Sequence, residues 1–371
     1  MKRGQFEKQH EVAPPSLSLN LGCSESFHLR NQDTARADLR ARAGTVHTGS
    51  MICPLPRRGV SRREFLLASA TAMAAPHLPA ADSATPAAEP EPIIDIHQHT
   101  NYHGRTHQQM LAHQKAMGIT LTLLLPSGSP METASTHKGK SNGLAAKTGG
   151  NQSCADFAYE HPDDYVFFAN EVTDHPFARK NIETFLIKGA RGIGEQKFGV
   201  ECDSKESQVL YELAAKYEVP VLLHFQEGTY NSGFRRLPTM LKKFPKTNFI
   251  MHAQTTWANI DADYDWKSLY PTGPVKRGGL TSKYLEDHPN CYADMSAGSG
   301  LNSLLRDEEH TRWFLEKHQD KILYGSDCAD TLGRGPGCQG AGTIAAIRKY
   351  ASSKQVERKI LFENSYKLFK L

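Results

Sequence analysis

From residue 93 onward, short apolar and β-branched runs alternate with longer stretches whose apolar residues have helical spacing. The runs predict eight strands, at residues 93–97, 120–126, 165–172, 190–198, 219–225, 247–253, 290–296 and 321–327. Between them, residues 207–218 place Leu210 and Leu213 on one helical face, and residues 310–319 have a similar pattern. An order of strand, helix and strand requires right-handed crossovers and a parallel sheet.

Eight such units are the number that closes into a (β/α)8 TIM barrel, and residues 93–371 have the usual length of that fold. An open doubly wound sheet is the competing architecture. We therefore predict an α/β protein with a single barrel domain at residues 93–371.

The residues before the barrel show another pattern, in which Arg62 and Arg63 precede an apolar run at 65–75 and then small residues. This order is typical of an export signal, and the segment SRREFL resembles the twin-arginine type. The resemblance implies a twin-arginine translocase as export partner and a periplasmic or otherwise exported bacterial protein. The apolar run is shorter than the ~20 residues that span a bilayer, which argues against a membrane anchor.

The signal divides the leader into three predicted parts. Residues 51–81 form the signal peptide, with cleavage after Ala74 or near Ala81, and residues 82–92 form a disordered spacer by composition. Residues 1–50 have no periodicity, and we interpret them as an unstructured or mis-started extension, with Met51 as the alternative start.

The formal net charge of +4 lies in this leader, because residues 75–371 hold 33 basic against 34 acidic residues. A nearly neutral body gives no reason to expect a nucleic-acid partner. Five of the seven cysteines follow Ala81, without any CxxC motif. Cys328 and Cys338 either bridge across one loop or stay reduced.

Ligand-type side chains stand at the carboxyl ends of the predicted strands, where barrel enzymes carry their chemistry. They are His97 and His99 after the first strand, Glu195 and Lys197 on the fourth, His224 on the fifth, His252 on the sixth, Asp294 on the seventh and Asp327 on the eighth. Residues two apart on a strand face the same side, so His97 and His99 can bind one ion through neutral imidazoles. The joint pattern predicts a metal site.

The ordered segments DIHQHT, LLHF, IMHA and YGSD resemble the amidohydrolase superfamily, and especially the branch that includes aminocarboxymuconate-semialdehyde-type decarboxylases. The resemblance runs from about Ile93 to the C-terminus. It implies a divalent ion, usually zinc, surrounded by His97, His99, His224 and Asp327. It also implies that in a mononuclear centre His252 polarises the substrate instead of binding the metal.

The predicted chemistry centres on Asp327. A carboxylate at the metal can take the proton of a metal-activated water as general base and return it to the leaving group as general acid. Attack on a carbon polarised by the metal and His252 supports hydrolysis of an amide, a lactone or an ester.

The fourth strand leaves the number of ions open between one and two. Binuclear relatives use a carboxylated lysine or a glutamate there as a bridge, and the segment GEQK offers both Glu195 and Lys197. If Glu195 bridges two ions, His224 and His252 bind the second. Otherwise Glu195 pairs with Arg191 or Lys197 and the centre is mononuclear.

Two insertions, a glycine-rich segment and three further histidines give weaker signals. Two insertions, at residues 127–153 and 254–289, should lie on the catalytic face as lids, substrate walls, packed loops or oligomer contacts. The segment at 335–340 satisfies GxGxxG but follows the last strand, which favours a substrate loop over a dinucleotide site. His103, His107 and His113 are expected to be solvated or to contact substrate.

The leading functional hypothesis is a metal-dependent hydrolase, with Lys197 and Asp294 as substrate contacts and a small molecule as substrate. A non-oxidative decarboxylase of a small carboxylic acid fits the same residues. A metal-bearing ligand-binding barrel is the non-enzymatic alternative. The chain is also expected to have no stable membrane anchor and to be a candidate homo-oligomer.

Overall fold

The computed structural model of the protein describes residues 91–128 and 148–371. The chain falls into two units, Met1–Asp82 and Ser83–Leu371, and the described residues all lie in the second. The leader segments before residue 91 therefore lie outside the described residues, and their assignment stays a prediction. Most of the first predicted insertion also lies outside them.

Eight parallel strands follow one another at the places the apolar runs predict. They are β1 (Ile94–Gln98), β2 (Leu121–Leu124), β3 (Tyr165–Phe167), β4 (Ile193–Gln196), β5 (Val221–His224), β6 (Phe249–His252), β7 (Cys291–Asp294) and β8 (Ile322–Leu323). Ladder pairing runs β1-β2-β3 and β4-β5-β6-β7-β8. Each strand is shorter than or equal in length to its apolar run.

Backbone hydrogen bonds close the two sets of strands into one barrel. Between β3 and β4, the amide of Arg191 donates to the Phe167 carbonyl at 2.8 Å. Between β8 and β1, the amide of Ile96 donates to the Tyr324 carbonyl at 3.1 Å, and the amide of Asp327 donates to the His97 carbonyl at 2.8 Å. The predicted (β/α)8 barrel is therefore confirmed, and the open-sheet alternative is excluded.

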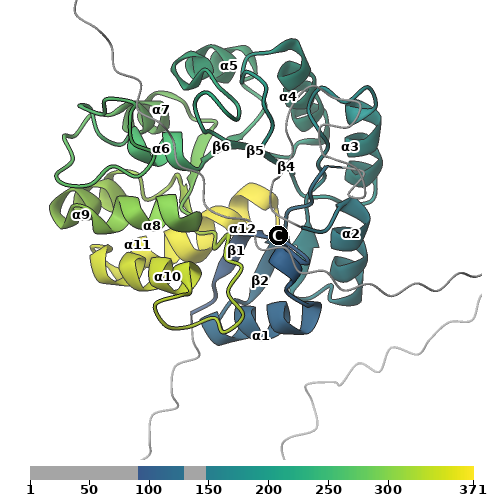
Figure 1. Ribbon diagram of the computed structural model, residues 1–371, viewed down its shortest axis with the longest axis horizontal. Helices are drawn as coiled ribbons and strands as arrows, with labels where there is room; N and C mark the ends of the chain where they lie inside the picture. Colours follow the sequence, from purple (N-terminus) through teal and green to yellow (C-terminus); the bar gives the residue numbers. More distant parts are fainter. Residues whose placement is uncertain (1–90, 129–147) are drawn as a thin grey trace, which may run out of the picture. The chain divides into compact units, whose positions relative to one another are not determined.

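Helices surround the strands as an outer ring, except the last, which lies across one end of the barrel (Figure 1). They are α1 (His107–Met117), α2 (Asn151–Glu160), α3 (Ala178–Ile187), α4 (Lys205–Tyr217), α5 (Leu237–Lys243), α6 (Gln254–Ala258), α7 (Leu280–Asp287), α8 (Ala297–Leu305), α9 (Glu308–Lys317), α10 (Gln339–Tyr350), α11 (Lys354–Arg358) and α12 (Asn364–Phe369), with short turns η1 (Tyr102–Gly104), η2 (Phe234–Arg236) and η3 (Lys359–Glu363). The two helices predicted from spacing correspond to α4 and α9. Ser204 caps α4 by accepting a hydrogen bond from the amide of Ser207.

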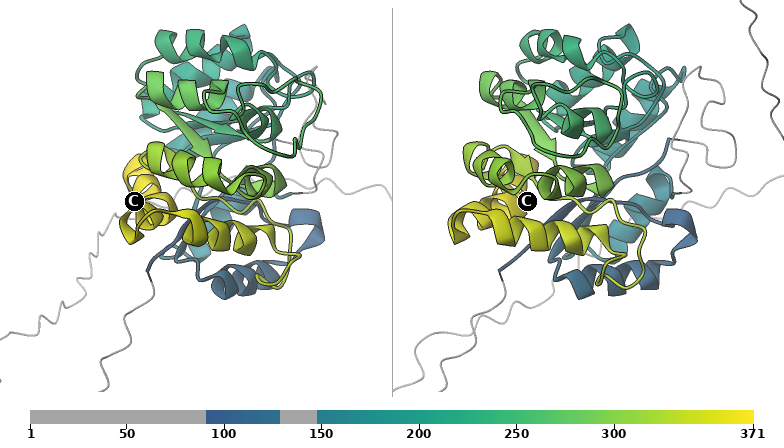
Figure 2. Two further views of the ribbon diagram at one scale, coloured as in Figure 1. Left: turned by 90° about the vertical axis from the view of Figure 1, so that its left-hand side faces the viewer. Right: turned by 60° about the vertical axis from the view of Figure 1, so that its left-hand side comes forward.

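The apolar residues form two layers of core. The larger layer lies between the strands and the helices. The smaller one fills the barrel interior with alternate strand residues, among them Ile94, Leu222, Ile250 and Leu323. Leu368 and Phe369 of α12 join this interior cluster, so the C-terminal helix plugs one end of the barrel, as Figure 2 shows from the side.

An extra residue in β1 turns His97 of that strand inward. Ile94 and Ile96 face the interior cluster, whereas Asp95 faces outward and accepts a hydrogen bond from Gln114 of α1. Regular alternation would send His97 outward with Asp95. The pairing with β2 contains one additional residue between Asp95 and Gln98, and this bulge shifts the phase so that His97 points into the barrel mouth.

β4 contains a similar irregularity with the same consequence for Glu195. The pairing with β5 gains one residue between Ile193, which faces the outer core, and Gln196. Gly194 lies at this point with φ of 144°, and a Cβ there would lie 2.8 Å from the Leu222 carbonyl oxygen. Glycine therefore permits the bulge that brings Glu195 inside.

None of the helices at residues 91–128 and 148–371 has both the length and the apolar character needed to cross a bilayer.

Candidate metal centre

Four histidines and three carboxylates converge at the carboxyl end of the barrel. They are His97, His99, His224, His252, Glu195, Asp294 and Asp327, and all are buried. Every one was predicted from its position at a strand end. Strand pairing explains part of the convergence, since His224 of β5 lies directly beside His252 of β6.

His97 on β1 and His99 just after it are each fixed by a hydrogen bond from the Nδ1 atom. His97 Nδ1 donates to Asp294 Oδ2 at 2.7 Å, and His99 Nδ1 donates to the Leu125 carbonyl at 2.7 Å. Because a carbonyl and an ionised carboxylate only accept, the proton resides on Nδ1 in the neutral imidazole. The Nε2 lone pairs are thereby turned toward the centre, as metal-binding histidines require.

His252 is held in the same way from β6. Its Nδ1 lies 3.0 Å from Ser296 Oγ and 3.2 Å from Asp294 Oδ2. Its Nε2 lies 3.5 Å from Glu195 Oε1 and 3.9 Å from Asp327 Oδ2. Asp294 therefore positions His97 and His252 together.

Three buried imidazole nitrogens point to a cation. Nε2 of His97, His224 and His252 have no hydrogen-bond partner among the described residues. A buried polar atom without a partner is costly, and a divalent cation bound by imidazole removes that cost. The residues present thus fit a metal ion.

Glu195 lies between two pairs of histidines, and one of its carboxylate oxygens faces each pair. Its Oε2 lies 3.6 Å from His97 Nε2 and 3.7 Å from His99 Nε2. Its Oε1 accepts a hydrogen bond from His224 Nδ1 at 2.5 Å and faces His252. Donor atoms within 4.8 Å of one another form three sets at the mouth: His97–His99–Glu195, Glu195–His224–His252 and His97–His252–Asp327.

The mononuclear ligand set that the resemblance implies would place His224 with His97, His99 and Asp327, and it stays a prediction. Among the described residues, His224 shares a potential ligand set with Glu195 and His252, and none with His97, His99 and Asp327. The bulge in β4 places the Glu195 carboxylate between His97 and His99 on one side and His224 and His252 on the other.

Asp327 follows β8 at the rim of the centre. Its Oδ1 lies 3.5 Å from His99 Nε2 and accepts a hydrogen bond from the Tyr102 hydroxyl at 2.9 Å. The side chain is 10% exposed, more than the other acidic groups of the centre. The carboxylate of Asp327 and burial together raise the pKa of Tyr102, so this hydroxyl stays a donor.

The electrostatics of the centre favour positive charge. Burial alone would raise the pKa of Asp294, but His97 and His252 outweigh it and bring the pKa to about 2. Burial opposes ionisation of Glu195 as well, and Lys197 and His224 still hold its pKa well below the usual value. Burial would lower the pKa of His97, yet Asp327 and Asp294 raise it well above the usual value. Charge at His97 Nε2 is therefore stabilised, which suits a cation.

Lys197 is half-buried beside the centre. Burial alone would lower its pKa, but Glu195 and Asp327 raise it above the usual value. Its Nζ lies 5.9 Å from the ring centroid of Tyr230, within the range of a cation–π contact. The predicted location of Lys197 at the mouth agrees with these contacts, whereas Asp294 is fully buried behind the histidines.

Sequence reasoning missed two residues that shape the centre, Tyr102 and Tyr230. Tyr102 lies three residues beyond His99, in a turn, and only the fold shows that its hydroxyl returns to Asp327. The ring of Tyr230 contacts His224, with centroids 5.5 Å apart. No spacing signal marks either residue.

The second insertion contributes mainly to packing. Trp257 of α6 is buried and donates from Nε1 to the Asp294 carbonyl at 3.0 Å. Trp266 lies under the guanidinium of Arg235 at 4.4 Å. Tyr270 is exposed, and its electrostatic influence reaches Lys197.

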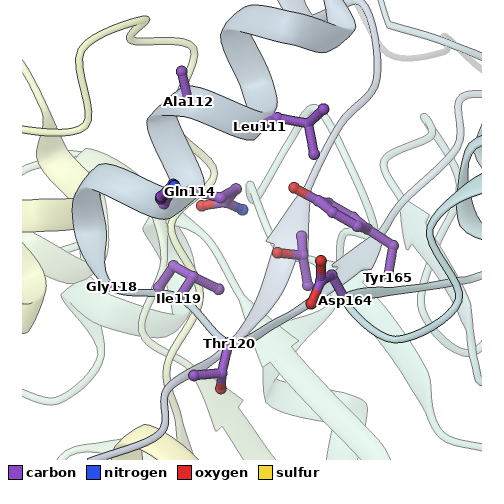
Figure 3. A pocket seen from close by; sticks show the side chains of 10 residues that line it. Leu111, Ala112, Gln114, Gly118, Ile119, Thr120, Asp164 and Tyr165 are labelled. Carbon is purple, nitrogen blue, oxygen red and sulfur yellow. The ribbon is translucent and has the colours of Figure 1, made fainter. Parts of the chain in front are cut away.

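A cavity of about 500 Å³, whose lining side chains are drawn in Figure 3, opens at the other end of the barrel from the centre. It lies between α1 and the first residues of β2 and β3, with Gln114, Thr122 and Tyr165 in its wall. None of the residues of the metal centre lines it.

Comparison with known proteins agrees with the fold. The family model described as "Amidohydrolase" matches residues 94–371, so the chain belongs to this family and is an enzyme of the amidohydrolase superfamily. No curated protein matches the chain.

Solved structures with low sequence identity are similar to this chain, and the first of the three named here supports the barrel fold. An uncharacterized TIM-barrel protein from Bordetella bronchiseptica has 13% identity and a TM-score of 0.52, over 75% of this chain and 98% of that one. A 2,6-dihydroxybenzoate decarboxylase from Rhizobium has 15% identity and a TM-score of 0.48, over 76% and 99%. A probable 2-pyrone-4,6-dicarboxylic acid hydrolase from Acinetobacter baumannii has 14% identity and a TM-score of 0.48, over 75% and 99%.

Proposed function

We propose that this protein is a metal-dependent hydrolase that cleaves an amide, a lactone or an ester of a small molecule. The observation that carries the proposal is the placement of Asp327. Its carboxylate is fixed by the Tyr102 hydroxyl, borders the imidazoles of His99 and His252, and reaches the rim of the barrel mouth. A carboxylate in this place can accept a proton from an attacking water and return it to the leaving group.

The proposal includes a centre for two zinc ions, in which Glu195 would be the ligand common to both. His97, His99 and Asp327 would serve the side of Oε2, and His224 and His252 the side of Oε1. When bound, the ions supply Lewis acidity, which lowers the pKa of water and polarises a substrate oxygen. In this arrangement His252 serves as a ligand; in a mononuclear centre it would be free to polarise the substrate.

The remaining residues hold the ligands and the substrate. Asp294 accepts from His97 and from Ser296 Oγ, and thereby fixes the imidazole rings. We assign it this positioning role in place of the predicted substrate contact, because its side chain is 0% exposed. Lys197, half-buried beside the centre, is suited to bind an anionic group of the substrate.

Lys197 also favours a second candidate function, a non-oxidative decarboxylase of a small carboxylic acid. A substrate carboxylate would pair with its ammonium group beside the centre. The two reactions differ in the fate of water, since hydrolysis adds water across a bond and decarboxylation releases carbon dioxide.

The test is turnover of lactone, ester, amide and aromatic-acid panels by the zinc-loaded protein in ¹⁸O-labelled water. The hydrolase proposal expects label in a carboxylic acid product. It also expects Asp327→Asn to lower kcat by about 10²–10⁴-fold, the size of an acid–base contribution. Release of carbon dioxide from an aromatic acid without incorporation of label would contradict it and establish the decarboxylase.

The export of the protein through the twin-arginine translocase is also a proposal, which rests on Arg62 and Arg63 ahead of the apolar run. It expects the wild-type protein in the periplasmic fraction and Arg62→Lys/Arg63→Lys in the cytoplasm. Equal distribution of the two proteins would contradict it.

A further inference from the structure

Four nitrogen and sulfur donors converge at a second place, outside the catalytic cluster. His113 and Met117 lie one turn apart on α1, Cys328 follows β8, and Cys338 precedes α10. Cys338 Sγ lies 3.8 Å from Cys328 Sγ, 3.4 Å from His113 Nε2 and 3.7 Å from Met117 Sδ. One thiol is therefore within contact distance of three further donors.

All four side chains are shielded from solvent. His113 is 0% exposed, each cysteine 1% and Met117 7%. The expectation that His113 is solvated is thus wrong, because the loop after β8 covers this side of α1. Both cysteines are free thiols, so the bridge considered from sequence is not formed.

The distances match the edges of a tetrahedral coordination sphere. With a zinc–sulfur distance of about 2.3 Å and a zinc–nitrogen distance of about 2.0 Å, tetrahedral angles separate two sulfurs by about 3.8 Å and sulfur from nitrogen by about 3.5 Å. The observed separations of 3.8 Å and 3.4 Å agree with both values. A disulfide would need the sulfurs at about 2.05 Å.

The surrounding backbone is held in place before any ligand binds. Arg105 donates from Nη1 to the carbonyls of Cys328 at 2.8 Å and Asp330 at 2.9 Å. Gly333 packs so closely that a Cβ there would lie 2.3 Å from the His113 carbonyl oxygen. A Cβ on Gly340 would lie 2.9 Å from Met117 Sδ. The loop is therefore fixed against α1, which preorganises the four donors.

We propose that His113, Cys328, Cys338 and Met117 form a second, thiophilic metal site for a soft cation, Zn²⁺ or Cu⁺. Thiolate and thioether donors select these ions over harder cations such as Mg²⁺ and Ca²⁺. On binding, the thiol protons pass to solvent and the sulfurs bind the ion. The ion joins α1 to the loop that begins at Asp327, so the site is structural and does not depend on the reaction proposed above.

Cobalt binding tests this site separately from the catalytic centre, because the catalytic cluster contains no sulfur ligand. Reduced, metal-free protein is titrated anaerobically with Co²⁺, and thiolate-to-cobalt charge-transfer absorption is recorded. We expect the absorption in the wild type and its loss in Cys328→Ala/Cys338→Ala. The control Cys202→Ala/Cys291→Ala removes two buried thiols elsewhere and should keep it.

Three outcomes would overturn the assignment. One is wild-type protein that binds Co²⁺ without charge-transfer absorption. Another is absorption that persists in Cys328→Ala/Cys338→Ala. The third is protein purified without reductant whose mass and peptide map show a Cys328–Cys338 disulfide.

The variant Met117→Leu keeps both thiols and the side-chain volume. It therefore tests the site even if the cysteine variant fails to fold. Competition with chromogenic chelators separates the two cations. We expect Met117→Leu to weaken Cu⁺ binding at least tenfold and Zn²⁺ binding by a smaller factor, since the soft thioether sulfur contributes more to Cu⁺ than to Zn²⁺. Unchanged Cu⁺ binding would overturn the assignment of Met117 as the fourth ligand.

Discussion

Asp294 does not face the barrel mouth, yet it orients two imidazoles of the metal centre. It lies behind the barrel mouth with both oxygens occupied, Oδ1 by the Ser296 amide and Oδ2 by His97 and the Ser296 hydroxyl. Carboxylates that hold metal-binding histidines fix the ring orientation and raise ligand basicity. Two imidazoles depend on this one side chain.

Asp294→Asn should therefore weaken metal binding by about 10–100-fold. An amide keeps the shape but cannot accept from two imidazoles as an ionised carboxylate does. Chelator competition measures the affinity, and Asp163→Asn, an exposed acid on another face, is the control. Metal affinity equal to that of the wild type would contradict the positioning role.

The identities of the site residues were predictable, but their geometry was not. Each ligand-type side chain occupies a strand end, which the apolar pattern marks along the sequence. Whether His97 and Glu195 face inward depends on the bulges in β1 and β4, and no local spacing records a bulge. The hydroxyl of Tyr102 reaches Asp327 across 225 positions of sequence, a contact only the closed barrel creates.

The segment after β8 illustrates how an element fits around the centre. Gly325 lies between β8 and Asp327, and a Cβ there would lie 2.5 Å from Asp294 Oδ1 and 2.8 Å from the Cβ of His97. Glycine is required because the space of a side chain is taken by two residues of the site.

Gly325→Ala should destabilise the protein by about 1–3 kcal/mol, as overpacking does. It should also lower the affinity for metal, since His97 and Asp294 must move. Denaturant unfolding and chelator competition check the two effects. Gly337→Ala is the matched control, because a Cβ at Gly337 meets nothing within 4 Å. Equal behaviour of the two variants would refute the packing argument.

At the scale of the whole molecule, the number and order of the strands were predictable from sequence, and the closure of the barrel followed. The plug at the end of the barrel was not predicted, because helical spacing alone does not show which surface Leu368 and Phe369 cover. The cluster of His113 with Cys338 was also hidden. Its members are 225 positions apart, and their meeting depends on the fold of a loop.

Two buried histidines on the outer layer make stability depend on pH. Burial lowers the pKa of His310 and His318 to about 4, from a usual value of 6.5. Lys317 and His310 lower the pKa of His318 further, and Asp307 opposes the effect at His310. The unfolded chain binds protons below pH 6.5 while the folded protein does not until about pH 4. The contribution of these two histidines to the free energy of unfolding is therefore full above pH 6.5 and is lost as the pH falls from 6.5 to 4.

His318→Gln should reduce the loss of unfolding free energy on acidification by about 1–2 kcal/mol. Glutamine does not titrate and can still form a hydrogen bond with Ser282. Urea unfolding at pH 7, 5.5 and 4.5 measures the change. His103→Gln, at an exposed histidine, should keep the wild-type pH dependence. A His318→Gln profile parallel to that of the wild type would contradict the prediction.

The central proposal is that Glu195 is a ligand shared by two zinc ions. Counting zinc by elemental analysis tests it most directly. The Cys328→Ala/Cys338→Ala background removes the proposed thiolate site, so the zinc that remains after gel filtration belongs to the barrel mouth. We predict two equivalents in this background and at most one after the further change Glu195→Gln. A single equivalent that is unaffected by Glu195→Gln would contradict the bridge and leave His252 free to polarise the substrate.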